Sequence, residues 1–201
     1  MIQKSAATSS KDTGIPPRAR ILAAAGELFY RHGIRAVGVE AIAAAAGTNK
    51  MTLYRHFAAK DDLVAEYLRQ AAQEADACWG RFERAYPGDT LGQLCAWLEE
   101  MAGHLAEPGE RGCALANAAV ELPEKNHPAR RVIEECKLAQ QARLIRLCRD
   151  AGLTDPEMLA DELLILLEGV RVTAQSVGTA GLAPKLLRMA EAMIAAHAAA
   201  R

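Results

Sequence analysis

The sequence predicts an all-α fold, and three of its properties support that prediction. Hydrophobic residues make up 51 % of the 201 residues, which is enough to bury a core, and the net charge is close to zero. Alanine is abundant while β-branched and aromatic residues are few, a bias that favours helices over strands. Apolar residues also recur three or four positions apart along most of the chain, and no stretch alternates as a strand would.

Two helices and a tight turn are expected within residues 16–47. Proline suits the first turn of a helix, so Pro17 can open the first helix, and Gly33 is placed to end it. A second, shorter helix fits residues 39–46. Gly47 then supplies a tight turn that leads into a third helix.

The stretch after this turn, residues 48–57, reads TNKMTLYRHF and contains one lysine, one arginine and one histidine but no acidic residue. Leu53 and Phe57 lie one helical turn apart, so burying both leaves the polar side chains pointing outward. A helix, a tight turn and a short helix with a basic exposed face form the helix-turn-helix arrangement, whose second helix fits the major groove. Double-stranded DNA is therefore the expected partner.

The charge is distributed unevenly along the chain. Residues 1–60 contain nine Lys or Arg and three Asp or Glu, whereas the remaining residues contain 15 and 22. A basic front suits a polyanion such as DNA, and an acidic remainder would not adhere to it. An ordinary solvated charge asymmetry is the alternative explanation.

Side-chain chemistry divides the outward residues of the third helix into two groups. Lys50 and Thr52 are suited to contacts with base edges, whereas Tyr54 and His56 are suited to hydrogen bonds with phosphate oxygens. The alternative for Tyr54 and His56 is a surface aromatic ring and a surface histidine without a function.

Residues 33–63, GIRAVGVEAIAAAAGTNKMTLYRHFAAKDDL, closely resemble the DNA-binding segment of TetR-type transcriptional regulators. The pattern K-x-T-L-Y-x-H-F followed by K-x-x-L carries this similarity. The resemblance implies about nine helices, a homodimer, and a repressor that a small-molecule effector releases from a palindromic operator. The regions expected are a flexible tail (1–15), a helix-turn-helix DNA-binding domain (16–60), and a ligand-binding and dimerisation domain (61–201).

The same resemblance assigns DNA contacts by position: bases for residues 50–52, and phosphates for Tyr54, His56 and Lys60. The residues expected to contact DNA are Gly38, Thr48, Asn49, Lys50, Met51, Thr52, Tyr54, Arg55, His56 and Lys60.

Three positions depart from the pattern of the family. Many members have Ser or Thr where this chain has Gly38, and that hydroxyl commonly contacts a phosphate; glycine can cap the helix but brings no side-chain donor. Ala59 replaces a frequent serine that would cap the next helix, and Asp61 and Asp62 partly compensate near the positive helix N-terminus. Met51 stands where glycine is common, and its side chain can touch a thymine methyl group.

Further helices and no strand are expected after the third helix. Apolar spacing and Pro or Gly stops place them at about 61–86, 89–105, 113–122, 128–151, 156–177 and 183–199. Residues 154–157, TDPE, read as a capping box at the start of the penultimate helix.

The last two helices are unusually apolar for a surface and rich in alanine, which permits close approach of helices. A two-fold, four-helix contact between protomers is the expected consequence, and an internal core wall is the alternative. The residues expected at this dimer interface are Leu159, Leu163, Leu166, Leu167, Val170, Leu186, Leu187, Met189, Met193 and Ile194.

A ligand site is expected among the middle helices, where aromatic residues and methionine share helix faces with a few polar groups. The candidate residues are Trp79, Phe82, Trp97, Met101, His104, Cys113, Asn117 and Glu121. Plain core packing is the alternative for the apolar members. No residue pattern names the effector, and no cofactor is expected.

The five cysteines form no C-x-x-C pair and no Cys/His pair at zinc-ligand spacing, so reduced thiols and no structural metal are expected. The N-terminus lacks the apolar segment of a signal peptide, and the apolar run from Leu163 is too short to span a bilayer. A cytoplasmic protein with no membrane contact is expected. Cys113, near Arg111 and at the start of a helix, is a candidate redox sensor, with a small packing residue as the alternative.

The sequence contains none of the nucleotide-binding, serine-hydrolase or metalloprotease motifs that would indicate an enzyme. The prediction is therefore a DNA-binding transcriptional regulator that is not an enzyme. Two alternatives remain open: a redox-responsive regulator that senses electrophiles or oxidants through Cys113, and a helical binding module that does not act on DNA.

Overall fold

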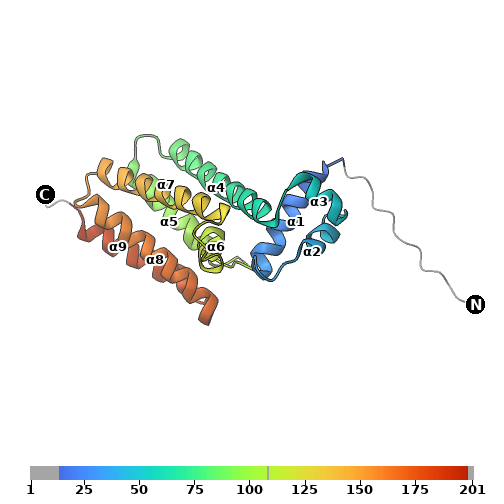
Figure 1. Cartoon of the computed structure of the whole chain (residues 1–201). Coiled ribbons are helices and arrows are strands. Elements are labelled where there is room, and N and C mark those ends of the chain that lie inside the picture. Colours follow the sequence, from blue (N-terminus) through green and yellow to red (C-terminus); the bar gives the residue numbers. More distant parts are fainter. Residues whose placement is uncertain (1–13, 108, 199–201) are drawn as a thin grey trace, which may run out of the picture. The chain divides into compact units, whose positions relative to one another are not determined.

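The computed structural model describes residues 14–107 and 109–198, and these residues form nine helices (Figure 1). Within the described ranges, the β pairing consists of one isolated bridge between Leu153 and Ala198. The helices are α1 (Pro17–His32), α2 (Val39–Ala45), α3 (Lys50–His56), α4 (Lys60–Ala85), α5 (Thr90–His104), α6 (Ala114–Glu121), α7 (Pro128–Asp150), α8 (Pro156–Val177) and α9 (Leu182–Ala196). The all-α prediction is confirmed. Residues 1–13 of the predicted tail lie outside the described residues.

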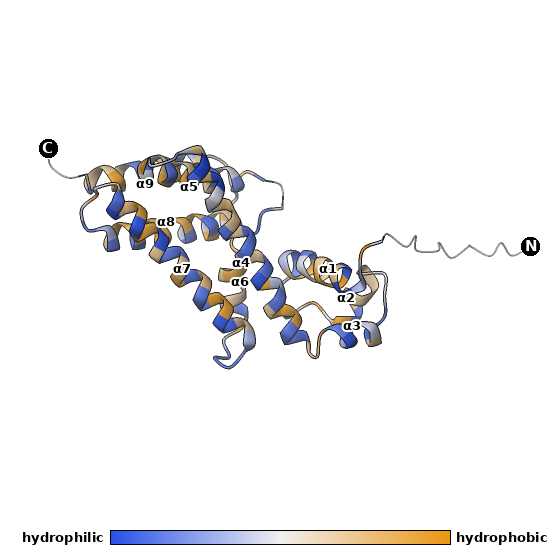
Figure 2. Ribbon diagram, turned by 90° about the horizontal axis from the view of Figure 1, so that it is seen from above, coloured by the Kyte–Doolittle hydropathy of each residue, from blue (hydrophilic) through white to orange (hydrophobic). Residues whose placement is uncertain are grey.

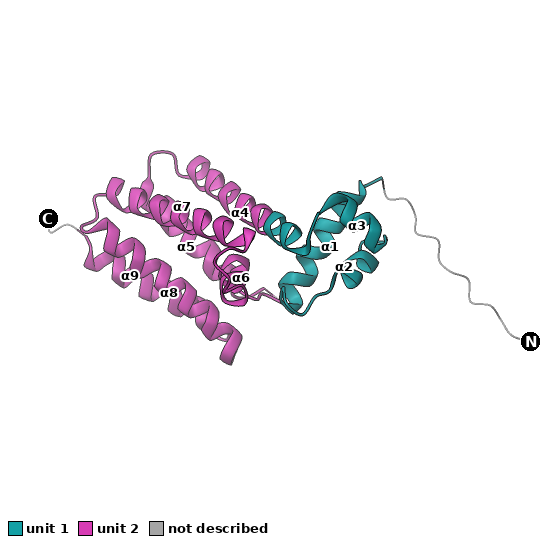
Figure 3. Ribbon diagram, in the orientation of Figure 1, with its two compact units in different colours: residues 1–67 teal, residues 68–201 magenta. Residues whose placement is uncertain are grey.

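The chain divides into two compact units, residues 1–67 and residues 68–201 (Figure 3). The division lies inside α4, whereas the domains expected from the sequence meet at residue 60, where that helix begins. α4 continues past this point because no proline interrupts residues 60–85.

Apolar side chains from three mutually contacting helices hold the first unit together. Ile21, Ala25 and Phe29 are buried along one side of α1, as their spacing of four residues requires. Ile42 of α2 and Leu53 of α3 are fully buried as well. This small core fixes α3 against α1 and α2, and so determines which side chains of α3 face outward.

The start of α4 is capped without the serine that is frequent in similar sequences. The carboxylate of Asp62 accepts a hydrogen bond of 3.1 Å from the backbone N–H of Ala59, the residue before the helix. This is the reciprocal half of a capping box, and it places a negative charge in the first turn, where the helix dipole favours it. The predicted compensation for Ala59 is thus provided by Asp62 through a direct bond.

The second unit is a bundle in which α7 contacts α5, α6 and α8, and α9 contacts α5 and α8. Figure 2 shows polar and apolar residues alternating in bands along α7, as expected for a helix with one buried side. The core residues of this unit include Leu94, Trp97, Leu144, Leu163 and Leu186, each almost or fully inaccessible to solvent.

His197, directly after α9, is hydrogen-bonded to the segment before α8. Thr154 donates both its backbone N–H and its hydroxyl to the carbonyl of His197, at 2.8 and 3.0 Å. Asp155, in the left-handed region at φ 45°, is the N-cap, and its carboxylate accepts from the N–H of Met158. The predicted capping box is therefore wrong in its register: the cap is Asp155 instead of Thr154, and Glu157 precedes the position from which it could reach back.

Candidate functional site

The turn between α2 and α3 has the geometry that fixes a helix-turn-helix. Gly47 takes φ 62°, in the left-handed region that glycine adopts without strain. The N–H of Gly47 donates to the carbonyl of Ala44, and the N–H of Thr48 donates to that of Ala43, which satisfies the free carbonyls at the end of α2. The side chain of Asn49 then accepts from the N–H of Thr52 at 2.9 Å and caps α3. The direction in which α3 leaves the turn is set by these bonds.

α3 presents an outward face without an acidic residue. Leu53 is fully buried and Phe57 is 4 % exposed, so the predicted anchoring pair is confirmed. Met51 is 74 % exposed, more than any other large apolar residue within 14–67. The other exposed side chains of this face are Lys50, Tyr54, Arg55 and His56, while Thr48 and Thr52 are half-buried.

Lys50 forms an ion pair with Glu40 of α2, with 2.6 Å between Nζ and Oε1. The hydrogen bond from Lys50 lowers the pKa of Glu40, and the same bond raises the pKa of Lys50. Both groups are exposed, so the pair adds little to stability. It does hold the ammonium of Lys50 at the base of the outward face, beside the ring of Tyr54.

Gly38 is the N-cap of α2 and provides no side-chain hydrogen bond there, as expected. A Cβ added at this position would meet only the Glu40 carboxylate, at 3.6 Å, which is ordinary van der Waals contact. A serine would therefore fit the backbone of this site.

Lys60 is half-buried, and its ammonium is already engaged in the fold. Nζ donates to the carbonyl of Ile34 at 2.6 Å and lies 5.8 Å from the centre of the Phe29 ring. The ammonium carries further donors, so the expected phosphate contact of Lys60 stays a prediction beside this structural role.

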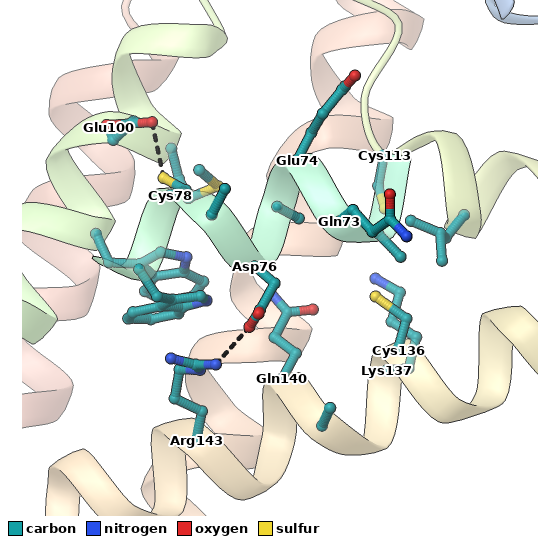
Figure 4. A pocket seen from close by; sticks show the side chains of 18 of the residues that line it. Gln73, Glu74, Asp76, Cys78, Glu100, Cys113, Cys136, Lys137, Gln140 and Arg143 are labelled. Carbon is teal, nitrogen blue, oxygen red and sulfur yellow. Dashed lines mark hydrogen bonds and ion pairs between the residues drawn. The ribbon is translucent and has the colours of Figure 1, made fainter. Parts of the chain in front are cut away.

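A cavity of about 900 Å³ lies in the second unit, between α4, α5, α7 and the segment leading into α6. Figure 4 shows Cys113, Cys136 and Lys137 toward one end of it, and Cys78, Glu100 and Arg143 toward the other. Its size is at the upper end of the range for small-molecule sites. The middle of α4 borders this cavity, which explains why Ala72 and Ala75, spaced as core residues, are not buried.

Five of the eight residues predicted for the ligand site line this cavity: Trp79, Trp97, Met101, His104 and Cys113. Phe82, Asn117 and Glu121 are not among its lining residues. Phe82 packs edge-on against Trp79 in the core, and the amide of Asn117 donates to the carbonyl of Arg111. The two tryptophan rings stack at 19°, with 5.5 Å between their centres.

The charged lining residues were not foreseen from the sequence. Five cationic and four acidic side chains line the cavity: Arg69, Arg81, Lys137, Arg143 and Arg171, with Glu74, Asp76, Glu100 and Glu135. Most come from α4 and α7, whose charged residues look like solvated faces when each helix is read alone. The positions of Lys137 and Arg143 along α7 were the available signal, but they do not reveal which neighbouring helix these side chains face.

Two further thiols, those of Cys78 and Cys136, also line the cavity. Burial, followed by the hydrogen bond to Glu100, raises the pKa of Cys78 to about 11. Burial also raises the pKa of Cys136, with a smaller contribution from Cys113 beside it. Both groups are therefore protonated near neutral pH and are weak nucleophiles.

The burial of several residues contradicts part of the predicted dimer interface. Four of its members, Leu159, Leu163, Leu167 and Leu186, are fully buried inside the protomer and cannot touch another subunit. They form the core wall that was the alternative reading. Another apolar row lies on the outer side of α8 and consists of Met158, Ile165 and Val172, which are 52, 73 and 62 % exposed. These three were missed because the most apolar positions of a helix are usually those that its own protomer buries.

No helix among the described residues is both long enough and apolar enough to cross a membrane. Across the same residues, no three His, Cys, Asp or Glu side chains gather in a way that could hold a metal ion.

Comparison with known proteins places the chain among bacterial regulators. Residues 21–67 match the family model described as bacterial regulatory proteins, tetR family. A TetR-family transcriptional regulator from Streptomyces coelicolor has 30 % sequence identity and a TM-score of 0.85, covering 90 % of this chain and 95 % of its own. A putative TetR-type regulator from Streptomyces avermitilis has 27 % identity and a TM-score of 0.74, with 91 % and 98 % covered.

A TetR-family regulator from Agrobacterium tumefaciens, at 23 % identity, shares the fold, with a TM-score of 0.80 over 88 % of this chain and 96 % of its own. No curated protein matches the chain significantly in sequence.

Proposed function

The chain belongs to the TetR family of bacterial regulatory proteins, and we propose that it is a repressor that a small molecule releases from its operator. In this proposal a dimer binds a palindromic DNA site through its two α3 helices. A ligand that fills the cavity of the second unit favours a state of the dimer that fits this site poorly, so affinity falls by a shift in population.

The outward face of α3 is the observation that supports operator binding most directly. A buried apolar pair anchors a helix whose exposed residues are basic, polar or flexible and include no acid. A face of this kind can enter the major groove without repelling the phosphates on either side.

Within this face, we assign base contacts to Lys50, Met51 and Thr52 and phosphate contacts to Tyr54 and His56. Met51 is 74 % exposed, which leaves its thioether side chain free to contact a thymine methyl group. Asn49 holds the helix cap and contributes by fixing the register of α3.

The outer row of α8 supports the dimer. Met158, Ile165 and Val172 are seven residues apart, the spacing at which side chains form one seam along a helix. Met189 of α9 is 49 % exposed and extends the apolar surface to the second helix. A two-fold contact through this surface presents two α3 helices to half-sites about 34–36 Å apart.

Selection of bound sequences from random double-stranded DNA tests the operator. The expected result is an inverted repeat whose half-sites are one helical turn apart, or a multiple of one turn. A variant with Met51→Ala should select half-sites with a changed base preference at one position, whereas Tyr54→Phe should weaken binding to all sequences alike. If no sequence is enriched, the chain is a helical binding module that does not read DNA.

One observation favours a second candidate function, in which the regulator senses electrophiles or oxidants. Cys113 is the N-cap of α6 and lines the same cavity as Cys136 and Lys137. Treatment with an electrophile such as N-ethylmaleimide should then abolish operator binding by the wild type and spare the Cys113→Ser variant. Equal loss in both proteins, or none in either, would exclude Cys113 as the sensor.

A further inference from the structure

The ratio of cations to carboxylates differs between the two ends of the cavity. At one end, Arg143 bonds to the carboxylates of both Asp76 and Glu83, and its guanidinium lies over the ring of Trp79 at 5.3 Å. Arg81 pairs with Glu100 nearby. Every cation named here has at least one carboxylate of its own, so this end carries no excess of positive charge.

At the other end, two cations share one carboxylate. The ammonium of Lys137 lies 2.5 Å from Oε1 of Glu168, and the guanidinium of Arg171 lies 3.6 Å from the same oxygen. The second terminal nitrogen of Arg171 points instead to the sulfur of Met101, at 3.2 Å. A thioether is a weak acceptor, so this N–H group is poorly satisfied and faces a cavity wall.

The two cations at this end are also more deeply placed than two of the lining acids, while a third acid, Glu100, is 25 % exposed and is paired with Arg81. The side chains of Arg171 and Lys137 are 14 % and 30 % exposed, whereas those of Asp76 and Glu135 are 71 % and 61 % exposed. Charges act over longer distances where water is excluded, so the inner cations dominate the potential that a bound molecule experiences.

Lys137 keeps its charge at this depth. Burial opposes the ammonium, but Cys113 and Glu168 beside it more than offset that effect, and the pKa of Lys137 is raised. The ammonium is therefore protonated throughout the neutral range.

The apolar part of the lining begins with Trp79 at the Arg143 end and reaches Met101, which Arg171 contacts at the other end. The stacked pair of Trp79 and Trp97, together with Met101, Leu115 and Val132, provides flat and flexible apolar surface. Such a wall accommodates a ring system, and a volume of about 900 Å³ has room for several fused or linked rings.

From these features we propose that the effector is an organic anion, a carboxylate carried on an apolar ring system, with the carboxylate held by Lys137 and Arg171. The rings lie against the tryptophan wall, and the carboxylate completes the hydrogen bonding of the Arg171 guanidinium, which favours planar two-oxygen partners. This inference rests on the proposed role of the cavity as the effector site, and it adds the chemical class of the ligand.

A matched pair of probes tests the charge requirement. Anthracene-9-carboxylate and its neutral amide have nearly the same shape, and both can quench tryptophan emission. The chain contains two tryptophans, and both line the cavity, so quenching reports binding at this site. The full-length wild type should bind the carboxylate at least about tenfold more tightly than the amide, the usual gain for a charge-assisted hydrogen bond.

Four variants separate the proposal from general damage to the fold. Lys137→Gln and Arg171→Gln should each weaken carboxylate binding about tenfold and leave the amide unchanged within twofold. Lys125→Gln, the same charge change in an exposed loop, should alter neither. Glu168→Gln should tighten carboxylate binding several-fold, because it frees both cations, and a misfolded protein cannot produce that gain.

The proposal is overturned if the two probes bind equally, if neither quenches the tryptophans, or if the preference for the carboxylate survives in both cation variants. Operator binding, measured on the same proteins without probe, separates this inference from the proposed function. Intact operator binding without a carboxylate preference counts against the ligand class alone. A carboxylate preference with no effect on the operator complex supports the ligand class and contradicts effector-controlled release.

Discussion

The two units of this chain build their sites in opposite ways. The proposed DNA-reading face of the first unit comes from one helix of seven residues and the turn before it, so neighbouring residues in the sequence are neighbours in the site. The cavity of the second unit takes its lining from α4, α5, α6, α7 and α8 and joins residues as far apart as Arg69 and Arg171. A local site can be recognised from a short motif, whereas a site assembled from distant helices depends on how those helices pack.

The largest expected effect is on the free energy of unfolding, and it distinguishes a core residue of the second unit from a residue on its outer surface. Leu163 and Ile165 are two residues apart on α8, but the first is fully buried and the second is 73 % exposed. Leu163→Ala should lower the free energy of unfolding by about 2–5 kcal/mol at every protein concentration, because it leaves a cavity in the core.

Ile165→Ala is the matched control for this change. It should cost little in the protomer and instead weaken the dimer, so its effect on urea unfolding should grow as the protein is diluted. Urea unfolding followed by circular dichroism, together with sedimentation equilibrium, measures both. A concentration-independent loss for Ile165→Ala would mean that this residue is not at a subunit contact.

The second effect tests whether Lys60 belongs to the fold, to the DNA site, or to both. Lys60→Met keeps the apolar stem but removes the donor to the Ile34 carbonyl, so the free energy of unfolding should fall by about 1–3 kcal/mol. If Lys60 also holds a phosphate, the slope of log affinity against log salt should decrease by about 1 for every DNA sequence.

Arg55→Met provides the comparison, because Arg55 is exposed on α3. It should reduce DNA affinity in the same sequence-independent way without altering thermal stability. An unchanged salt slope for Lys60→Met would assign Lys60 a structural role alone.

These contrasts also explain how much the sequence could predict. The turn at Gly47 and the buried pair Leu53 and Phe57 depend on spacing within a few residues, and both were predicted correctly. The helix bounds depend on the same local spacing and were predicted to within about a residue, except that the last helix ends at Ala196 and was expected to reach residue 199. The fully buried members of the dimer prediction were assigned wrongly, because the apolar periodicity of α8 and α9 marks a buried side without saying whether a subunit or the same chain covers it.

The cavity shows which kind of site residue the sequence could not predict. Its aromatic residues could be nominated because large side chains at helical spacing stand out in a sequence. Lys137 and Arg171 could not be nominated, because they meet only where α7 and α8 pack together. Their shared partner Glu168 interrupts an apolar run that otherwise looks like plain core. Charged residues on long helices carry no local mark that separates a solvated face from a cavity wall.

A smaller effect concerns the departure from the family pattern at Gly38. Gly38→Ser should fit without strain and supply a hydroxyl at the start of α2, where the family resemblance implies a phosphate contact. Stability should change by only a few tenths of a kcal/mol, but operator affinity should rise several-fold, as one added hydrogen bond of about 1 kcal/mol implies. Fluorescence anisotropy with labelled operator measures the change. Gly38→Ala serves as the control, and an equal gain for alanine would assign the effect to the helix and not to the hydroxyl.

The smallest effect concerns the Glu40–Lys50 pair, which links the two helices of the helix-turn-helix. The pKa of Glu40 is lowered by its bond to Lys50, so the pair forms above the ordinary carboxyl pKa and is lost only as the pH falls through the lower folded value. Between about pH 6 and 8 the pair is therefore intact, and the proposed base contact requires Lys50 to exchange Glu40 for DNA. Glu40→Gln should leave stability nearly unchanged, since the pair is exposed, yet raise operator affinity about two- to fivefold at low salt. Glu27→Gln, which removes an exposed acid paired along α1, is the control for net charge. If operator affinity rises equally in both variants, the effect comes from the net charge of the first unit, and Glu40 does not restrain Lys50.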